Sequence, residues 1–173
     1  MTPVMIRILA AAATLAALAS LSTAHAAGDV ARCGGAQLAG SFTVVPGSAG
    51  AGSITYALRL KNTSASSCTI TGLPLGRLLG RRRQPLPTHV RAAFPGALTA
   101  ILVTLAPGQA TRATARFSPD VPGPGETASA RCEPIAYWLR VAGQGGGSTA
   151  VKVAPPTPVC EHGQLRFSAY GSG

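Results

Sequence analysis

The chain has 173 residues and a formal net charge of +10, with 15 basic residues against 5 acidic ones. Even before any N-terminal leader is subtracted, a chain of this length suits one domain with a single core and leaves no room for a second domain. The basic residues are not interleaved with aromatic ones. The charge therefore favours a solvated basic surface, or a site for an anionic partner, and we expect no nucleic-acid partner.

Residues 1–26 have the pattern of a secretory signal peptide. One positive charge precedes the apolar run of residues 8–21, and Ala24 and Ala26 fit a signal peptidase that cleaves after Ala26. The apolar run is too short to span a membrane. We therefore expect a secreted or envelope-associated protein whose mature chain has no transmembrane segment and begins with a short stretch, residues 27–32.

Beyond this stretch, apolar and polar residues alternate in short runs separated by turn signals, and helical periodicity is absent. The clearest predicted strands are residues 53–61 and 135–141, in which every second side chain would face a core. Residues 38–44 precede a glycine-rich loop and predict a hairpin with the first of these strands. Further strands are expected at residues 68–71, 75–79, 86–91, 100–105, 109–117, 151–153 and 164–170.

Turn residues predict where the chain reverses between these strands. Residues 80–84 are expected at a hairpin tip, and the strand after it at a sheet edge, because Pro85 and Pro87 cannot donate to a ladder. Residues 118–129 contain three prolines and two glycines and can only be a loop.

These runs, taken as about eight or nine short strands with no helices between them, predict an all-β domain over residues 33–170, followed by a tail, residues 171–173. An antiparallel sandwich is the expected architecture, and a barrel is the alternative.

The four cysteines follow the predicted leader, in an oxidising compartment where pairs become disulfides. Three pairings are possible, and closeness in the sequence favours Cys33 with Cys68 and Cys132 with Cys160. A metal or redox site is not expected. The chain has no Cys-x-x-Cys motif, and His89 and His162 show no ligand spacing.

The sequence contains no recognisable catalytic motif. It lacks a Gly-x-Ser-x-Gly elbow and a His-Glu-x-x-His element, so we expect no catalysis and no cofactor. The alternative is a hydrolase with a discontinuous site, which would have to draw on His89, His162, Glu133 and Glu161. A glycosidase with two carboxylates would have to use Glu126, Glu133 and Glu161, and their spacing does not support it.

Three sequence features invite a binding or modification hypothesis. Arg81, Arg82 and Arg83 put three charges on one turn, which could bind phosphates or carboxylates or could simply be solvated. Trp138 is predicted to be buried against a second sheet, and an exposed sugar-stacking platform is the alternative. Residues 62–64 match a glycosylation sequon but are interpreted as a turn.

The order of these pieces resembles the actinobacterial domain of unknown function 4232. The resemblance rests on Cys33, the Cys-Thr-x-x-Gly-x-Pro element at residues 68–74, the stretches 58–64 and 103–110, and the late Cys132 and Cys160. It covers roughly residues 33–169. It implies an extracytoplasmic, immunoglobulin-like β-sandwich with disulfides and no known activity.

The chain departs from this family in two places. Many members look like lipoproteins, but Arg32 stands before Cys33 where lipidation needs a small residue, so we expect no lipid anchor. Leu73 stands where an aromatic residue often follows the glycine of the family's motif, so no role of that ring transfers. The family offers no catalytic residues.

These expectations combine into one functional hypothesis. The chain is predicted to be a secreted, monomeric, non-catalytic binding module of the cell envelope. Its expected partner is an extracytoplasmic protein or an anionic cell-wall polymer.

Overall fold

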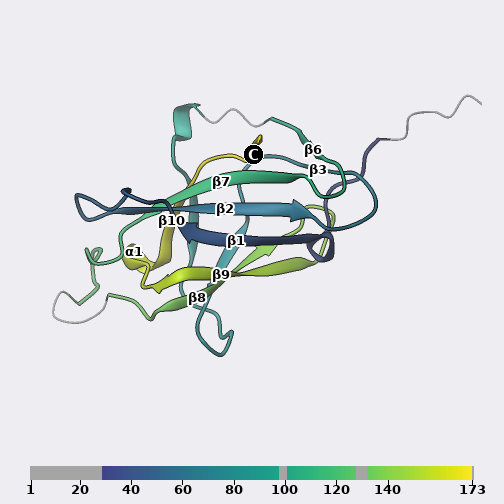
Figure 1. The fold of residues 1–173 in the computed structure, drawn as a ribbon. Helices are drawn as coiled ribbons and strands as arrows, with labels where there is room; N and C mark the ends of the chain where they lie inside the picture. Colours follow the sequence, from purple (N-terminus) through teal and green to yellow (C-terminus); the bar gives the residue numbers. More distant parts are fainter. Residues whose placement is uncertain (1–28, 98–100, 128–131, 173) are drawn as a thin grey trace, which may run out of the picture.

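The computed structural model describes residues 29–97, 101–127 and 132–172, and its regular structure is nearly all β (Figure 1). The predicted signal peptide and its cleavage site after Ala26 lie outside the described residues. Within those residues, no helix combines the length and the apolar composition that a membrane crossing requires.

The described part of the chain contains eleven strands, where eight or nine were predicted, and several of them are only two to four residues long. They are β1 (Leu38–Val44), β2 (Ile54–Asn62), β3 (Cys68–Ile70), β4 (Gly76–Leu79), β5 (His89–Ala92), β6 (Val103–Leu105), β7 (Ala110–Phe117), β8 (Ala136–Ala142), β9 (Ser148–Thr157), β10 (Gln164–Phe167) and β11 (Gly171–Ser172). Two 3-10 turns, η1 (Gly35–Gln37) and η2 (Pro95–Ala97), and one helical turn, α1 (Cys160–Gly163), complete the described elements.

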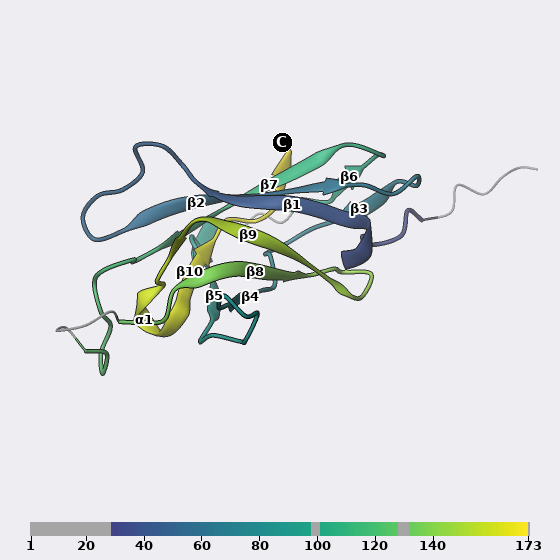
Figure 2. The same ribbon diagram turned by 60° about the horizontal axis from the view of Figure 1, so that its bottom comes forward.

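Most of the strands form one mixed sheet in the order β4-β8-β9-β1-β2-β7-β10-β5, with β11 beside β7, while β3 and β6 pair separately. The sheet curls, so that β7, β2 and β1 lie on one side of the molecule and β8, β4, β5 and β10 on the other (Figure 2). Its two end strands approach each other, since the Leu78 N–H, in β4, donates to Thr88 Oγ1, just before β5, at 2.9 Å.

The prediction of an all-β chain with two disulfides is confirmed, but the antiparallel sandwich is wrong in detail. Two strand pairs, β1 with β9 and β10 with β5, are parallel, and the curled sheet is nearly closed and barrel-like. Parallel pairing needs strands far apart in the sequence, and no local turn signal reports it.

The core follows from the alternation in the central strands β2 and β7. Tyr56, Leu58 and Leu60 are fully buried, and Ala113 and Ala115 of β7 face the same core, as predicted. Phe42 of β1 packs against Tyr56, with 5.1 Å between ring centroids. Burial raises the pKa of the Tyr56 hydroxyl, which donates to the Pro155 carbonyl at 2.8 Å. The aromatic residues therefore join β1 and β2 to the proline-rich half of β9.

The disulfides join Cys33 to Cys68 and Cys132 to Cys160, which is the pairing that closeness in the sequence favours. The first fastens the N-terminal segment to β3. The second fastens the end of the residue 118–135 connection to α1. Strand β3 and turn α1 lie at opposite ends of the molecule in both views (Figures 1 and 2).

Several predicted segments differ in the structure. Residue 100 lies outside the described residues, and Ile101 and Leu102 are 44% and 61% exposed. The predicted buried strand is therefore reduced to β6, in which Leu105 is buried and Val103 packs against the core. Strand β9 spans ten residues, including Pro155 and Pro156, where three were predicted. The predicted tail contains β11, which pairs with β7.

The turn at residues 62–64 begins with a buried polar side chain. Asn62 is fully buried, and its Nδ2 donates to the carbonyls of Ser66 (2.8 Å) and Leu105 (2.9 Å). Its Oδ1 accepts the backbone N–H of Ser64 at 3.0 Å. Both the nitrogen and the oxygen of the Asn62 amide are hydrogen-bonded, so Asn62 holds the loop after β2 against β6. This arrangement agrees with the interpretation of the sequon as a turn.

Candidate functional site

The predicted arginine cluster lies at a compact turn between β4 and β5. The turn closes through hydrogen bonds from the Gly80 N–H to the Gln84 carbonyl (2.9 Å) and from the Arg83 N–H to the Gly80 carbonyl (3.0 Å). Arg83 adopts a left-handed backbone with φ 61°, a conformation that a non-glycine residue adopts only where its surroundings hold it. Beyond this turn, β4 and β5 do not pair with each other; only an isolated bridge joins Leu79 to Pro85, while β4 pairs with β8 and β5 with β10. We call Arg81, Arg82 and Arg83 the arginine tip.

Two aromatic rings of β8 lie beneath the arginine tip. The Arg83 guanidinium carbon is 4.2 Å from the centroid of the Trp138 ring, and that of Arg81 is 5.1 Å from the centroid of Tyr137. Lys152 of β9 is the direct ladder partner of Trp138, and its Nζ lies 5.9 Å from the same ring centroid. Three cations therefore converge on two adjacent rings, at distances typical of cation–π contacts.

The structure corrects the expected burial of Trp138. Its side chain is half-buried, beneath Arg83 and outside the cluster of buried core residues. The pairing of β8 with β9 shifts between Ala136 and Trp138, so Ala136 and not Tyr137 is fully buried there. Such an irregularity breaks the strict alternation of a strand and re-aims its side chains. Trp138 is thus a support for a cation, where the sequence suggested a core residue or a bare sugar platform.

The arginine tip and Lys152 have no acidic neighbour in the described part of the chain. The ion pairs found there all lie around α1, where His162 contacts Glu126 and Glu133 and Arg166 contacts Glu161. The remaining two acids, Asp29 and Asp120, make no ion pair with the tip within residues 29–97, 101–127 and 132–172. The tip therefore presents positive charge that the described residues do not neutralise.

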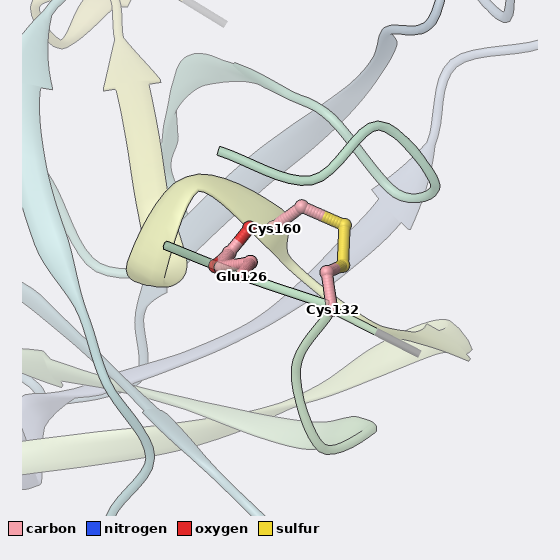
Figure 3. A group of neighbouring side chains, drawn as sticks. All are labelled: Glu126, Cys132 and Cys160. Carbon is pink, nitrogen blue, oxygen red and sulfur yellow. A yellow bond between two sulfur atoms is a disulfide. The ribbon is translucent and has the colours of Figure 1, made fainter. Parts of the chain in front are cut away.

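A second cluster surrounds α1, beside the Cys132–Cys160 disulfide (Figure 3). Glu161, His162 and Gly163 all have positive φ, so α1 is a left-handed turn and not an ordinary helix. A side chain at position 163 would place its Cβ 1.9 Å from the Pro87 carbonyl oxygen, which requires glycine there. The backbone N–H groups of the turn consequently point together at one side.

The Glu126 carboxylate receives the N–H groups of this turn. It accepts from the N–H of His162 at 2.5 Å, Gly123 at 2.6 Å and Glu161 at 2.9 Å, and its side chain is 3% exposed. Burial alone would raise the pKa of Glu126, but these three hydrogen bonds and the nearby His162 ring outweigh it and lower the pKa. Glu126 is therefore an ionised clamp between the residue 118–127 loop and α1.

Glu133 lies close to this clamp, but its pKa shifts in the opposite direction. Its carboxylate oxygen is 3.8 Å from His162 Nδ1, and burial followed by the charge of Glu126 raises its pKa. The ligand atoms of Glu126, Glu133 and His162 all lie within 4.8 Å of one another, a spacing that could hold a metal ion. The neighbouring Cys132 and Cys160 sulfurs are joined to each other in the disulfide.

This cluster brings together part of what a discontinuous hydrolase would need. His162 and Glu133 meet, as that alternative required, while His89 lies in β5 opposite Gln164 and Glu161 pairs with Arg166 at 3.0 Å. Sequence reasoning named Glu126 among the carboxylates that a glycosidase would have to use, but it did not predict the contact with His162, 36 positions away. The Pro-Gly-Pro-Gly stretch before it indicated only a loop, and no spacing reports a contact with α1.

Most of the chain matches the model of one protein family. The model of a domain of unknown function, DUF4232, matches residues 33–171. The chain belongs to this family. The matched region of this DUF4232 domain begins at Cys33 and ends within β11, so it includes the whole curled sheet, the arginine tip and the α1 cluster. A search of the curated proteins and a search of the solved structures found no match.

Proposed function

We propose that this DUF4232 domain is a secreted, non-catalytic binding module of the cell envelope that holds an anionic wall polymer with its arginine tip. One observation carries the proposal. Arg81, Arg83 and Lys152 converge on Tyr137 and Trp138, with no acidic partner among the described residues. The predicted leader and the two disulfides support an exported, oxidised protein.

The geometry favours binding of anions over mere solvation because the charges are held in place. Stacking on a ring restrains a guanidinium while its N–H groups stay available for phosphate or carboxylate oxygens. Ordering a long side chain beforehand reduces the entropy that binding would otherwise cost. The compact turn from Gly80 to Gln84 keeps the three arginines adjacent, so they can contact successive charges of a polymer.

The test is retention of the protein on a phosphate-linked wall glycopolymer, eluted with a salt gradient. The triple variant R81A/R82A/R83A should elute at clearly lower salt than the unaltered protein, because its contacts with the polymer are electrostatic. The matched control is R59A/R91A/R112A, which removes three exposed arginines from β2, β5 and β7. The control should elute close to the unaltered protein.

Equal losses in the two triple variants would contradict the proposal, because they would show attraction by net charge without a site. The same incubations address the second candidate, a hydrolase, which the contact between Glu133 and His162 favours. A binding module releases no soluble polymer fragments. Release of fragments that Glu133→Gln abolishes would replace the proposed function with the hydrolase.

A further inference from the structure

A cleft of about 300 Å³ lies where the curled sheet comes closest to closing. Its lining comes from Leu75 before β4, from β4 itself, from β8, from the start of β9 and from Val90 of β5. The apolar part of the wall is Leu75, Val90 and Ala142, and Leu75 is 64% exposed. Such a volume is at the small end of ligand pockets and suits a small molecule or the end of a peptide.

Two arginines face each other at this cleft. Arg77 of β4 and Arg140 of β8 are direct ladder partners, and both side chains line the cleft and are exposed. Like charges directly opposite each other destabilise a sheet. Neither arginine makes an ion pair or a side-chain hydrogen bond with another residue of the described ranges. Their repulsion is therefore not relieved by those residues.

A second cross-strand arginine pair in this protein does have hydrogen-bonding partners. Arg116 of β7 and Arg166 of β10 are also ladder partners and also line one cavity, of about 290 Å³. There, Arg166 contacts the Glu161 carboxylate at 3.0 Å, and Arg116 donates to Ser53 Oγ at 2.8 and 2.9 Å. Glu161 lines that cavity as well. In this pair, a carboxylate contacts one arginine and a hydroxyl contacts the other.

We propose that the cleft between Arg77 and Arg140 binds the carboxylate of a small ligand whose apolar body lies on Leu75, Val90 and Ala142. The external carboxylate takes the place that Glu161 has beside Arg166. Guanidinium forks match the two oxygens of a carboxylate. The free end of a peptide with a small apolar last residue has this chemistry. The proposal goes beyond polymer binding and does not depend on it, since the arginine tip lies outside the lining of this cleft.

The test is an NMR titration of the full mature protein with N-acetyl-alanyl-alanine, compared with the same probe as its C-terminal amide. The acid should shift the signals of Arg77, Arg140 and Val90 at millimolar concentration, and the amide, which lacks the charge, should not. In R77Q/R140Q the affinity should fall about tenfold or more, because each lost contact is a charge-assisted hydrogen bond.

The matched control is R59Q/R112Q, which removes another arginine pair aligned in register, on β2 and β7. Binding of the acid should be unchanged in this control and in R81A/R82A/R83A. Equal shifts with acid and amide, no shifts at the cleft, or undiminished affinity in R77Q/R140Q would each overturn the proposal. The comparison of acid with amide uses the unaltered protein and holds even if a variant folds poorly. Failure of polymer retention would leave these results as they stand.

Discussion

At the scale of single residues, the α1 cluster holds two carboxylates in opposite environments. Glu126 receives three backbone N–H groups, which lower its pKa despite its burial. Glu133, a few ångströms from the same His162 ring, has its pKa raised by burial and by the charge of Glu126. One carboxylate therefore stabilises the folded state when it is ionised, while the other costs stability when it is ionised.

We expect Glu126→Gln to lower the free energy of unfolding at pH 7 by about 1–3 kcal/mol, because an amide cannot match the charge-assisted hydrogen bonds. A lowered folded-state pKa means that this contribution is complete above the unfolded glutamate pKa of about 4.3 and is lost as pH falls through the folded value. Urea unfolding between pH 7 and pH 3 should thus show the gap between variant and unaltered protein narrowing with acidification.

The control is Glu133→Gln, which should change the stability at pH 7 in the opposite direction. A raised folded-state pKa means that ionised Glu133 costs stability once pH exceeds that value, and costs nothing below the unfolded value. The variant should therefore be slightly more stable than the unaltered protein at pH 7 and equal to it in acid. Two variants that shift stability in the same direction at pH 7 would contradict the opposite roles of these carboxylates.

At the scale of elements, strand β8 decides the chemistry of the arginine tip. Its pairing with β4 is regular from Gly76 to Leu79, but its register against β9 shifts next to Trp138. Because of this shift, Ala136 and not Tyr137 takes the buried position, so Tyr137 lies beneath an arginine, as the neighbouring Trp138 does. The outer position of Trp138 follows from its alternation with the buried Leu139 and Val141, whereas that of Tyr137 depends on the shift.

We expect Trp138→Leu to weaken polymer retention about as much as Arg83→Ala, because a cation–π contact is worth about 0.5–2 kcal/mol and leucine offers no ring face. Combined, the two substitutions should cost little more than either one, as residues that act as a pair are not additive. Salt elution from the wall polymer measures all three variants. Trp138→Phe keeps a ring and should retain most of the binding, whereas strictly additive losses would show that Trp138 does not support Arg83.

Local pattern predicted the strands that alternate regularly and failed where long-range pairing decides. The buried faces of β2 and β7 follow directly from Tyr56, Leu58, Ala113 and Ala115. Strand β9 was predicted too short because prolines normally end a strand, but β9 continues past Pro155 and Pro156 to Thr157, which pairs with Ala136 of β8.

The candidate sites also contain features that the sequence reveals and features that it does not. The run from Arg81 to Arg83 is visible in the sequence, because its members are adjacent. The rings beneath it, the Glu126 clamp and the alignment of Arg77 with Arg140 all depend on register or on contacts between distant segments. No spacing rule in a single sequence reports such contacts.

At the scale of the whole molecule, the two disulfides lie at opposite ends of the fold. Cys33–Cys68 spans 35 positions at the end where β3 lies, and Cys132–Cys160 spans 28 positions at the end where α1 lies. Loops of such similar length predict similar stabilisation from chain entropy, about 3–4 kcal/mol each. Only the second disulfide adjoins an ionised clamp, because Cys160 directly precedes the residues that hold Glu126.

We therefore expect C33A/C68A and C132A/C160A to lose comparable stability at pH 7 but to differ in their response to acid. Without Cys132–Cys160, the connection of residues 118–135 is no longer tied to α1, so the hydrogen bonds to Glu126 form less completely and its pKa returns toward the ordinary value. The stability of C132A/C160A should then depend less on pH between 7 and 3 than that of C33A/C68A. Urea unfolding of both variants across this range measures the difference, and parallel pH profiles would show that the clamp forms without its disulfide.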